Sequence, residues 1–269
     1  MNTSQISSLA VERVRHPLQV RRLQVQRVDR ISASFLRIRF AGDALHGFVS
    51  ASFDDHAKLM LPPQPGQPLV LPEPGPDGLA QPTGSEKPAM RDYTPRHFDA
   101  AACVLDIEFV LHGDGVASRW AEAAKPGDEV GLGGPRGSFM VPTGFDWHVL
   151  VGDETAIPAI ARRLEELPDT AQAITVIATA DVGDRRAFST RARLQSHWIE
   201  TGSTDALARH VAALTLPAGE GLAWAAGEAA SMAAVRQALV DGHGLDKARV
   251  RASAYWKRGS AGHHETLGG

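Results

Sequence analysis

The chain of 269 residues contains a single cysteine, Cys103. One cysteine cannot form an internal disulfide, and it excludes a metal site built from several cysteines. The sequence also lacks a large excess of either charge, because 28 Lys and Arg residues face 31 Asp and Glu residues and the formal net charge is −3. Such a chain has no overall attraction for nucleic acid or for an anionic membrane, so any site for an anion must be built locally.

Long apolar segments are absent as well. The N-terminal segment MNTSQISSLAVERVRH has no continuous apolar core of the kind found in signal peptides, and no apolar run reaches the length that spans a bilayer. We therefore expect a cytoplasmic protein of one large or two ordinary domains, with no membrane insertion and no nucleic-acid partner.

The first half of the chain has the pattern of antiparallel strands. The run FLRIRF at 35–40 alternates apolar residues with arginines, and VLDIEFVLH at 104–112 alternates them with Asp106 and Glu108. Alternation of this kind is typical of strands with one face in the core and one face in water. Between the two runs, residues 62–90 are dense in Pro and Gly, which predicts a long surface loop.

The second half changes character after VPTGFD at 141–146. The apolar run WHVLVG at 147–152 is typical of a strand buried on both faces, and helical and strand-like stretches alternate after it. Such alternation predicts right-handed crossovers and a parallel sheet. We therefore predict two domains of different class: an antiparallel β-barrel at 1–143, followed by an α/β domain with a parallel sheet at 144–269.

The stretch RDYTPR at 91–96 combines three unlike groups. Arg91 carries a permanently charged fork, Tyr93 a flat aromatic ring, and Thr94 a small hydrogen-bond donor. Together they suit a ligand that has both a phosphate and a flat ring. Alone, the stretch also fits an ordinary edge strand.

Three separated motifs resemble one known family. RDYTPR at 91–96, DIEFVLHGDGVASRWAEAAKPGDEVGLGGPRGSF at 106–139 and SAYWKRG at 253–259 are similar, in this order, to the siderophore-interacting proteins, also called ferric-siderophore reductases. This family has the layout of flavin reductases of the ferredoxin–NADP reductase type. The resemblance implies an FAD-binding barrel, a nicotinamide-nucleotide domain, and reduction of siderophore-bound Fe(III) to Fe(II), which releases iron.

On this interpretation the first domain binds FAD. Arg91 clamps the diphosphate, Tyr93 stacks on the isoalloxazine ring or lines the ribityl chain, and Thr94 donates toward flavin N5. A helix that begins near Ala117 and Ser118 offers free N–H groups to the diphosphate, which is why we favour FAD over FMN. A further candidate, His112, either packs beside the adenine or makes a structural hydrogen bond.

The second domain departs from the usual dinucleotide-binding pattern. VGDETAIPAI at 151–160 follows the first strand, where an α/β sheet binds its ligand, but the usual Gly-rich loop is missing, and Asp153 and Glu154 would repel phosphate. This departure favours weak or transient nicotinamide binding. We expect Thr155 at the helix start near the flavin edge, and a second helix start at Gly227 and Glu228 toward the nicotinamide.

The choice of electron donor stays open at this level. Asp181 can bond a ribose 2′-OH, whereas Arg185 and Arg186 can hold a 2′-phosphate, which slightly favours NADPH over NADH. The two arginines are equally well explained as solvated surface residues. Ferredoxin remains a further possible donor.

The C-terminal motif supplies two aromatic residues, Tyr255 and Trp256. With Thr94 they are the candidate catalytic residues, because one of the two aromatics is expected to cover the flavin face opposite Tyr93. The alternative is a pair of core aromatics at the domain interface.

A ferric siderophore of the catecholate or mixed type is an anion, so its site needs a local positive patch. Four candidates come from three segments: Lys58, Arg136, Lys257 and Arg258. They can converge only at the domain junction. The alternative for Lys58 is an ordinary solvated lysine balanced by Asp54 and Asp55.

The sequence therefore predicts a monomeric, FAD-dependent NAD(P)H:ferric-siderophore oxidoreductase that needs no metal ligand of its own. Two alternatives remain: a reductase of the same superfamily with another electron acceptor or a ferredoxin donor, and a siderophore-binding protein without enzymatic activity.

Overall fold

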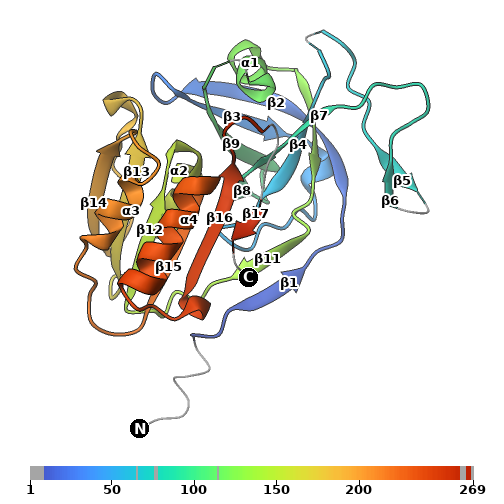
Figure 1. The fold of residues 1–269 in the computed structure, drawn as a ribbon. Coiled ribbons are helices and arrows are strands. Elements are labelled where there is room, and N and C mark those ends of the chain that lie inside the picture. Colours follow the sequence, from blue (N-terminus) through green and yellow to red (C-terminus); the bar gives the residue numbers. More distant parts are fainter. Residues whose placement is uncertain (1–8, 65, 76–77, 114, 261–264, 268–269) are drawn as a thin grey trace. The chain divides into compact units, whose positions relative to one another are not determined.

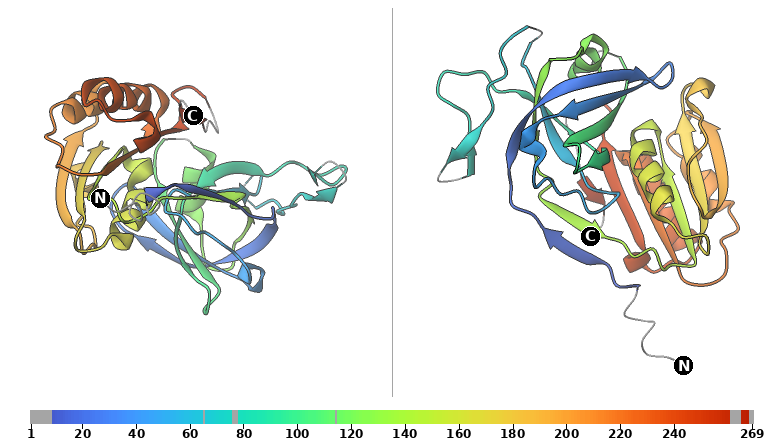
Figure 2. Two further views of the ribbon diagram at one scale, coloured as in Figure 1. Left: turned by 90° about the horizontal axis from the view of Figure 1, so that it is seen from below. Right: turned by 180° about the vertical axis from the view of Figure 1, so that it is seen from behind.

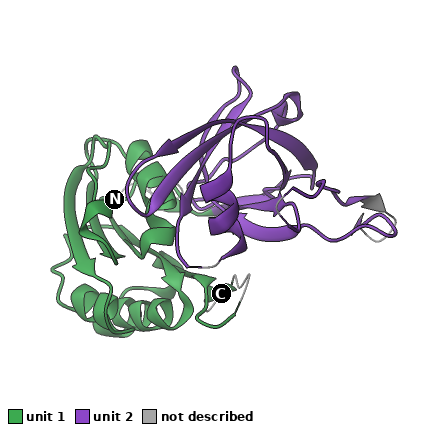
Figure 3. Cartoon of the chain, turned by 90° about the horizontal axis from the view of Figure 1, so that it is seen from above, with its two compact units in different colours: residues 1–11, 141–269 green, residues 12–140 purple. Residues whose placement is uncertain are grey.

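The computed structural model describes residues 9–64, 66–75, 78–113, 115–260 and 265–267. The chain divides into two compact units (Figure 3). Residues 12–140 form one of them, the barrel unit, and residues 141–269 together with 1–11 form the other, the α/β unit. The division after Met140 lies three residues before the boundary that the sequence predicts.

The barrel unit is built on a seven-stranded antiparallel sheet with the strand order β7-β4-β10-β2-β3-β9-β8 (Figure 1). Its strands are β2 (Val20–Arg30), β3 (Phe35–Ala41), β4 (Ala57–Leu61), β7 (Ala89–Tyr93), β8 (Pro95–Asp99), β9 (Val104–Val110) and β10 (Glu129–Gly133). Leu59, Ile107 and Leu132 are among the apolar side chains that fill its core. The predicted antiparallel fold class is confirmed.

The two edge strands of this sheet, β7 and β8, are joined by one residue, Thr94. Consecutive Cα atoms lie about 3.8 Å apart, so opposite edges of a seven-stranded sheet can be joined in this way only if the sheet curls round on itself. Thr94 therefore marks the seam of the barrel.

Smaller elements complete the barrel unit. Helix α1 (Val116–Ala123) follows β9, and the 3-10 turn η2 (Asp43–Leu45) follows β3. Strand β1 (Glu12–Arg15) pairs with β11 (Gly137–Met140) as a separate two-stranded ladder. The segment predicted as a long loop contains a short hairpin of β5 (Glu73–Gly75) and β6 (Gly78–Ala80), which extends away from the seven-stranded sheet (Figure 2).

One detail of the predicted strand pattern is wrong. Asp106 and Glu108 were expected on a water-facing side of β9, but they are only 4% and 3% exposed. Arg39 donates two hydrogen bonds of 2.7 Å to Asp106, and Arg37 donates one of 2.6 Å to Glu108 from the neighbouring strand β3. Alternation reports which residues are charged, whereas their burial depends on the cross-strand arginines that cover them.

The α/β unit has a six-stranded sheet with the order β14-β13-β12-β15-β16-β17 (Figure 1). The parallel strands are β12 (Trp147–Gly152), β13 (Gln172–Thr179), β14 (Arg193–Glu200), β15 (Gly221–Glu228) and β16 (Val250–Trp256), and β17 (Glu265–Leu267) is antiparallel. The predicted parallel α/β class is confirmed.

Helices cover both faces of this sheet. α3 (Ala206–Ala212) and α4 (Ala229–Gln237) share one apolar core with alternate residues of the central strands, and α2 (Ile157–Glu166) lies on the opposite face (Figures 1 and 2). Short turns complete the unit: η3 (Glu154–Ala156), η4 (Val182–Asp184), the π-helical turn η5 (Ala238–Gly242) and η6 (Lys247–Arg249). Within the described ranges, no helix is long and apolar enough to cross a membrane.

Candidate functional site

Arg91 and Tyr93 lie within β7, an edge strand of the seven-stranded sheet. One guanidinium nitrogen of Arg91 donates to the carbonyl of Met90 at 2.7 Å, which leaves its other donors for a ligand. The ring of Tyr93 packs against Phe109 with the ring centroids 4.5 Å apart, and burial raises the pKa of the Tyr93 phenol. Tyr93 is thus a rigid, neutral wall beside a charged fork.

Thr94, at the barrel seam, is only 6% exposed. Among the described residues its hydroxyl makes no hydrogen bond, and its oxygen is not one of the fully buried side-chain atoms without a partner, so solvent reaches it. An accessible hydroxyl at the barrel seam can donate to a ligand or to water.

Helix α1 begins without a side-chain cap. Its N-cap residue is Gly115, which has no side chain to offer, and the first N–H bonded back to it is that of Arg119. The N–H groups of the first turn, including those of Ala117 and Ser118, therefore have no acceptor among the described residues. The Ser118 hydroxyl instead accepts from the backbone N–H of His112 at 3.1 Å, and the His112 side chain is exposed.

These groups in the barrel unit fit a flavin dinucleotide. They comprise a guanidinium, a free hydroxyl and an uncapped helix start, and all of them are donors. A diphosphate needs such donors, and the positive end of a helix favours its charge. The Tyr93 ring adds a flat apolar wall suited to a ring system.

The positive candidates in the barrel unit differ from one another. Lys58 in β4 forms an ion pair of 2.9 Å with Asp92, so its balancing charge is not Asp54 or Asp55, the partners that the alternative interpretation named; both are buried. Arg136 follows the cis Gly134–Pro135 bond and is exposed. Across the described part of the chain its guanidinium has no ion-pair or hydrogen-bond partner. Arg136 is therefore the freer of the two cations.

A buried hydrogen-bonded chain adjoins Arg136. The Ser138 hydroxyl donates to the carboxylate of Asp55 at 2.8 Å and lies 2.8 Å from Nε2 of His16. The backbone N–H of His16 donates in turn to the Arg136 carbonyl at 3.0 Å. This chain fixes the loop that presents Arg136.

In the α/β unit the carboxyl end of β12 is occupied by Asp153, which is 7% exposed. Its carboxylate accepts from the backbone N–H and the hydroxyl of Thr155, from the backbone N–H of Glu228 at 2.9 Å, and from the indole of Trp256 at 2.8 Å. Burial raises the pKa of Asp153, while these bonds act in the opposite direction.

Other carboxylates occupy the same edge of the sheet. Glu228 caps α4 by accepting from the N–H groups of Ala230 and Ser231, and Asp181 caps η4 by accepting from the N–H of Gly183 at 2.7 Å. The helix start expected at Gly227 and Glu228 therefore exists, but Glu228 already takes its first donors. A bound phosphate would have to displace these carboxylates.

The C-terminal motif separates its two aromatic residues. Tyr255 packs within the unit against Trp224, with the rings 6.2 Å apart and edge to face. Trp256 is 37% exposed and is held by its bond to Asp153. Lys257 and Arg258 follow and are exposed.

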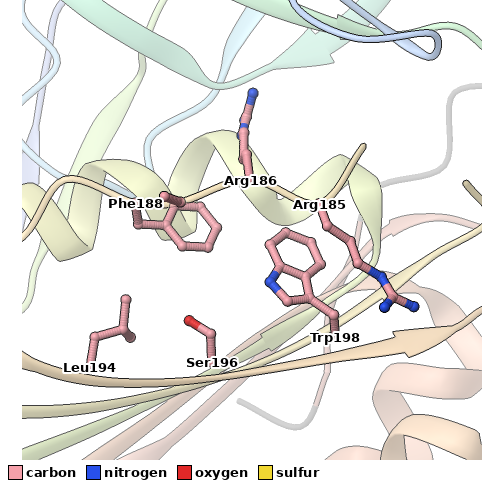
Figure 4. A pocket seen from close by; sticks show the side chains of 7 residues that line it. Arg185, Arg186, Phe188, Leu194, Ser196 and Trp198 are labelled. Atoms are coloured by element: carbon pink, nitrogen blue, oxygen red, sulfur yellow. The ribbon is translucent and has the colours of Figure 1, made fainter. Parts of the chain in front are cut away.

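A pocket of about 480 Å³ lies beside the edge strand β14 (Figure 4). Two aromatic rings, Phe188 and Trp198, stack there with centroids 5.8 Å apart and an angle of 7° between them. The predicted Arg185 and Arg186 line the same pocket. Aromatic faces and arginines in one pocket suit an adenine ring with a phosphate.

Sequence reasoning missed several of these features. The bonds of Asp153 join segments about 75 and 100 residues apart in the chain, so no local pattern reveals them. Phe188 follows the predicted Arg186 by two residues and was an available signal, whereas Trp198, twelve residues after Arg186, was not.

Comparisons with known proteins agree with this arrangement. Residues 24–139 match the model of the siderophore-interacting FAD-binding domain, and residues 145–259 match that of the siderophore-interacting protein. The chain is 40% identical over 247 residues to the NADPH-dependent ferric-chelate reductase of Escherichia coli strain K12, covering 91% of this chain and 96% of that protein. It is 34% identical over 245 residues to the ferric vibriobactin reductase ViuB of Vibrio cholerae, covering 89% and 90%.

Solved structures give the same result. A siderophore utilization protein from T. fusca superposes with a TM-score of 0.86 at 35% identity, covering 94% of this chain and 98% of that one. The ferredoxin reductase of carbazole 1,9a-dioxygenase shares the fold at 18% identity, with a TM-score of 0.63. With relatives this similar over nearly its whole length, the chain belongs to the siderophore-interacting protein family, and its barrel unit is the family's FAD-binding domain.

Proposed function

We propose that this protein is an FAD-dependent NADPH:ferric-siderophore oxidoreductase, which reduces siderophore-bound Fe(III) to Fe(II) so that iron is released in the cytoplasm. The names of its relatives in Escherichia coli and Vibrio cholerae, a ferric-chelate reductase and a ferric vibriobactin reductase, support this reaction. Hard oxygen ligands hold Fe(III) more firmly than Fe(II), so reduction weakens the siderophore's grip on iron. We expect the protein to act as a monomer.

The observation that carries the proposal is the donor cluster of the barrel unit. Arg91, Thr94 and the uncapped start of α1 supply cationic and neutral donors. This set suits a flavin diphosphate and ring far better than it suits a cationic or purely apolar ligand.

When bound, FAD accepts a hydride from the nicotinamide and passes electrons singly to the ferric centre. The protein's own residues bind and orient the reactants. Arg91 and the N–H groups of α1 hold the diphosphate, Thr94 offers a hydrogen bond to the flavin ring, and Tyr93 supplies a neutral wall. Of the two C-terminal aromatics, we propose that the exposed Trp256 contacts the flavin, because Tyr255 is engaged with Trp224.

The acceptor is an anion, and we propose that Arg136, Lys58, Lys257 and Arg258 attract it. Arg136 contributes more than Lys58, because Asp92 partly neutralises Lys58, whereas the Arg136 guanidinium has no ion-pair partner among the described residues. The patch is exposed, so added salt weakens its effect on binding.

We propose NADPH as the preferred donor. The stacked rings of Phe188 and Trp198 suit an adenine, and Arg185 and Arg186 in the same pocket suit a 2′-phosphate. The relative from Escherichia coli is named as NADPH-dependent, which supports this choice.

One observation favours a second candidate, a reductase fed by ferredoxin. Carboxylates take the backbone donors at the edge of the parallel sheet, which weakens that edge as a nucleotide site. A protein donor would not need those N–H groups.

Stopped-flow reduction separates the two candidates. FAD-loaded protein is mixed with NADPH, with NADH or with reduced ferredoxin, and flavin bleaching is followed with and without a ferric tris-catecholate. We expect NADPH to reduce the flavin fastest and the ferric catecholate to reoxidise it, with Fe(II) captured by a chelating dye. Reduction by ferredoxin alone contradicts the nicotinamide assignment, and catecholate binding without any flavin reduction indicates a carrier.

The acceptor patch is tested by substitution. Arg136→Ala should weaken ferric catecholate binding by roughly tenfold, the equivalent of about 1.4 kcal/mol, and Lys58→Ala by less. Both variants should keep their full FAD content. The exposed Arg27, which is paired with Asp29, provides the control Arg27→Ala, which should bind as the wild type does. Unchanged affinity in an Arg136→Ala/Lys257→Ala double variant would place the acceptor elsewhere.

A further inference from the structure

Asp153 lies at the topological switch point of the parallel sheet. From the boundary between β12 and β15, the chain winds through β13 and β14 in one direction and through β16 in the other. Open α/β sheets bind their ligands at the carboxyl ends of the two strands that flank such a boundary. Gly152 ends β12, Glu228 ends β15, and Asp153 directly follows Gly152.

The Asp153 carboxylate bonds to both sides of this boundary. One oxygen accepts from the N–H and hydroxyl of Thr155, which follow β12, and the other accepts from the N–H of Glu228 at the end of β15 and from Trp256 at the end of β16. All four partners are donors. The two backbone N–H groups and the indole N–H can only donate, so they favour the ionised carboxylate, whereas the Thr155 hydroxyl can donate or accept.

Gly227 makes this approach possible. Its φ of 152° lies in a region that favours glycine, and a Cβ at this position would come within 2.5 Å of Oδ2 of Asp153. The backbone at the end of β15 is therefore shaped around the carboxylate and not around an outside ligand.

In dinucleotide-binding domains, backbone N–H groups at a switch point receive the diphosphate of the ligand. We propose that the Asp153 carboxylate takes the place of that diphosphate, as a built-in anion, and so excludes the diphosphate of the electron donor from the switch point. The inference rests on the proposed function in one respect, the identity of the donor.

Neighbouring carboxylates also oppose the binding of a diphosphate at this edge of the sheet. Glu154 accepts from the N–H of Ala180 beyond β13, and Glu228 accepts from the first N–H groups of α4. The donor dinucleotide is then held mainly through the pocket of Arg185 and Trp198 at the β14 edge. A dinucleotide that is bound at only one of its ends can leave quickly once it has been oxidised.

The test removes the built-in anion from the full-length, FAD-loaded protein. Asp153→Asn keeps the size of the side chain but turns an amide NH2 toward donor groups, and Asp153→Ser leaves the same donors open. Asp246→Asn is the matched control, because Asp246 also caps a turn, η6, through the N–H of Ala248 at 2.9 Å, but it precedes β16 at the opposite edge of the sheet.

Isothermal titration with pyrophosphate and with adenosine 2′-monophosphate gives the readout. We expect no pyrophosphate binding at 5 mM by the wild type or by Asp246→Asn, and millimolar or tighter binding by both Asp153 variants, a gain of about tenfold or more. Adenosine 2′-monophosphate, which has no diphosphate, should bind all four proteins alike. A residue with only a structural role would lower stability and would not create pyrophosphate binding.

Two results overturn the proposal. One is folded Asp153 variants, judged by circular dichroism, that bind pyrophosphate no better than the control. The other, which needs no variant, is wild-type protein that binds pyrophosphate and loses it when NADP+ is added. Neither readout depends on turnover, so failure of the proposed enzymatic function appears separately, as absence of NADPH oxidation.

Discussion

The two units treat their backbone donors in opposite ways. In the barrel unit, the start of α1 at Gly115 has no side-chain cap and the Thr94 hydroxyl makes no hydrogen bond to any described residue. In the α/β unit, Asp153, Asp181 and Glu228 each accept from N–H groups at the carboxyl edge of the sheet. One unit leaves its anion-binding groups open, and the other satisfies them with its own carboxylates.

This difference explains how one chain could bind two dinucleotides with different affinities. Open donors prepared by the fold can bind an anion without displacing a protein group, so on the proposed function FAD is expected to remain bound through many turnovers. Donors already paired with carboxylates gain little from a phosphate and add repulsion. On the proposal above, the second dinucleotide is expected to bind weakly and to leave quickly after it delivers its hydride.

The largest effect is expected when the glycines at the two helix starts are compared, because only Gly227 should resist a side chain strongly. Gly227→Ala forces a side chain onto a φ of 152° and against Asp153, which should cost about 3 kcal/mol of the α/β unit's stability. Gly115→Ala is the matched change in the barrel unit, where φ is −59° and the nearest atom to the new Cβ is the end of the His112 side chain at 3.3 Å, with the His112 carbonyl and the Ser118 Cβ at 3.7 Å, so it should cost about 1 kcal/mol or less.

Urea unfolding checks this pair, with helical circular dichroism reporting chiefly on the α/β unit and flavin release on the barrel unit. Equal losses of stability in the two variants would mean that the backbone at Gly227 does not pack closely against the Asp153 carboxylate.

The next effect concerns the open donors. Arg91→Ala removes a charge-assisted contact with the FAD diphosphate, which should cost roughly 1.5–3 kcal/mol, or about tenfold or more in FAD affinity. The barrel should stay folded, because the single hydrogen bond that the Arg91 side chain makes to a described residue is the one to the neighbouring Met90 carbonyl. FAD titration of the stripped protein gives the affinity, and Arg22→Ala, which breaks an exposed ion pair with Glu129, serves as control. Unchanged FAD affinity would remove Arg91 from the site.

A third effect concerns the pH dependence of stability, which should differ between the two units. His148 in β12 is fully buried, and burial together with the charge of Arg163 lowers its pKa to about 3. In the unfolded chain the His148 imidazole is protonated below about pH 6.5, whereas in the folded chain it stays neutral down to about pH 3. Stability therefore falls as the pH drops below about 6.5. At pH 5 the loss is about 2 kcal/mol.

His148→Leu removes this titration, so the variant should lose about 2 kcal/mol less than the wild type between pH 7 and pH 5. Urea unfolding at the two pH values measures it, and flavin release should show no such difference. Parallel pH profiles for wild type and variant would show that His148 is protonated in the folded state.

The sequence was sufficient for the fold class and for most elements, because hydrophobic periodicity is local. WHVLVG became β12, and RDYTPR marked the barrel strand that carries Arg91. It was insufficient where a partner lies far along the chain. The burial of Asp106 depends on Arg39, and the pairing of Lys58 depends on Asp92.

The negative charges at the end of β12 could be predicted from the sequence, but the hydrogen bonds that these carboxylates make could not. Asp153 and Glu154 signalled repulsion of phosphate from the sequence alone. That Asp153 satisfies donors from three strand ends needed the register of β12, β15 and β16, which only the folded chain contains.

The smallest effect tests the closed edge at α4. Glu228 accepts from the N–H groups of Ala230 and Ser231, so Glu228→Ala should cost about 1 kcal/mol of stability, and Glu228→Gln, which keeps an oxygen acceptor, only a few tenths. Both changes remove a negative charge from the edge, but only Glu228→Ala also frees two donors. If closed donors explain weak donor binding, the KM for NADPH should fall modestly in Glu228→Gln and further in Glu228→Ala, although the latter is the less stable protein. Steady-state kinetics with ferric catecholate as acceptor measures the order, and a KM that rises with the loss of stability would show that the cap serves the helix alone.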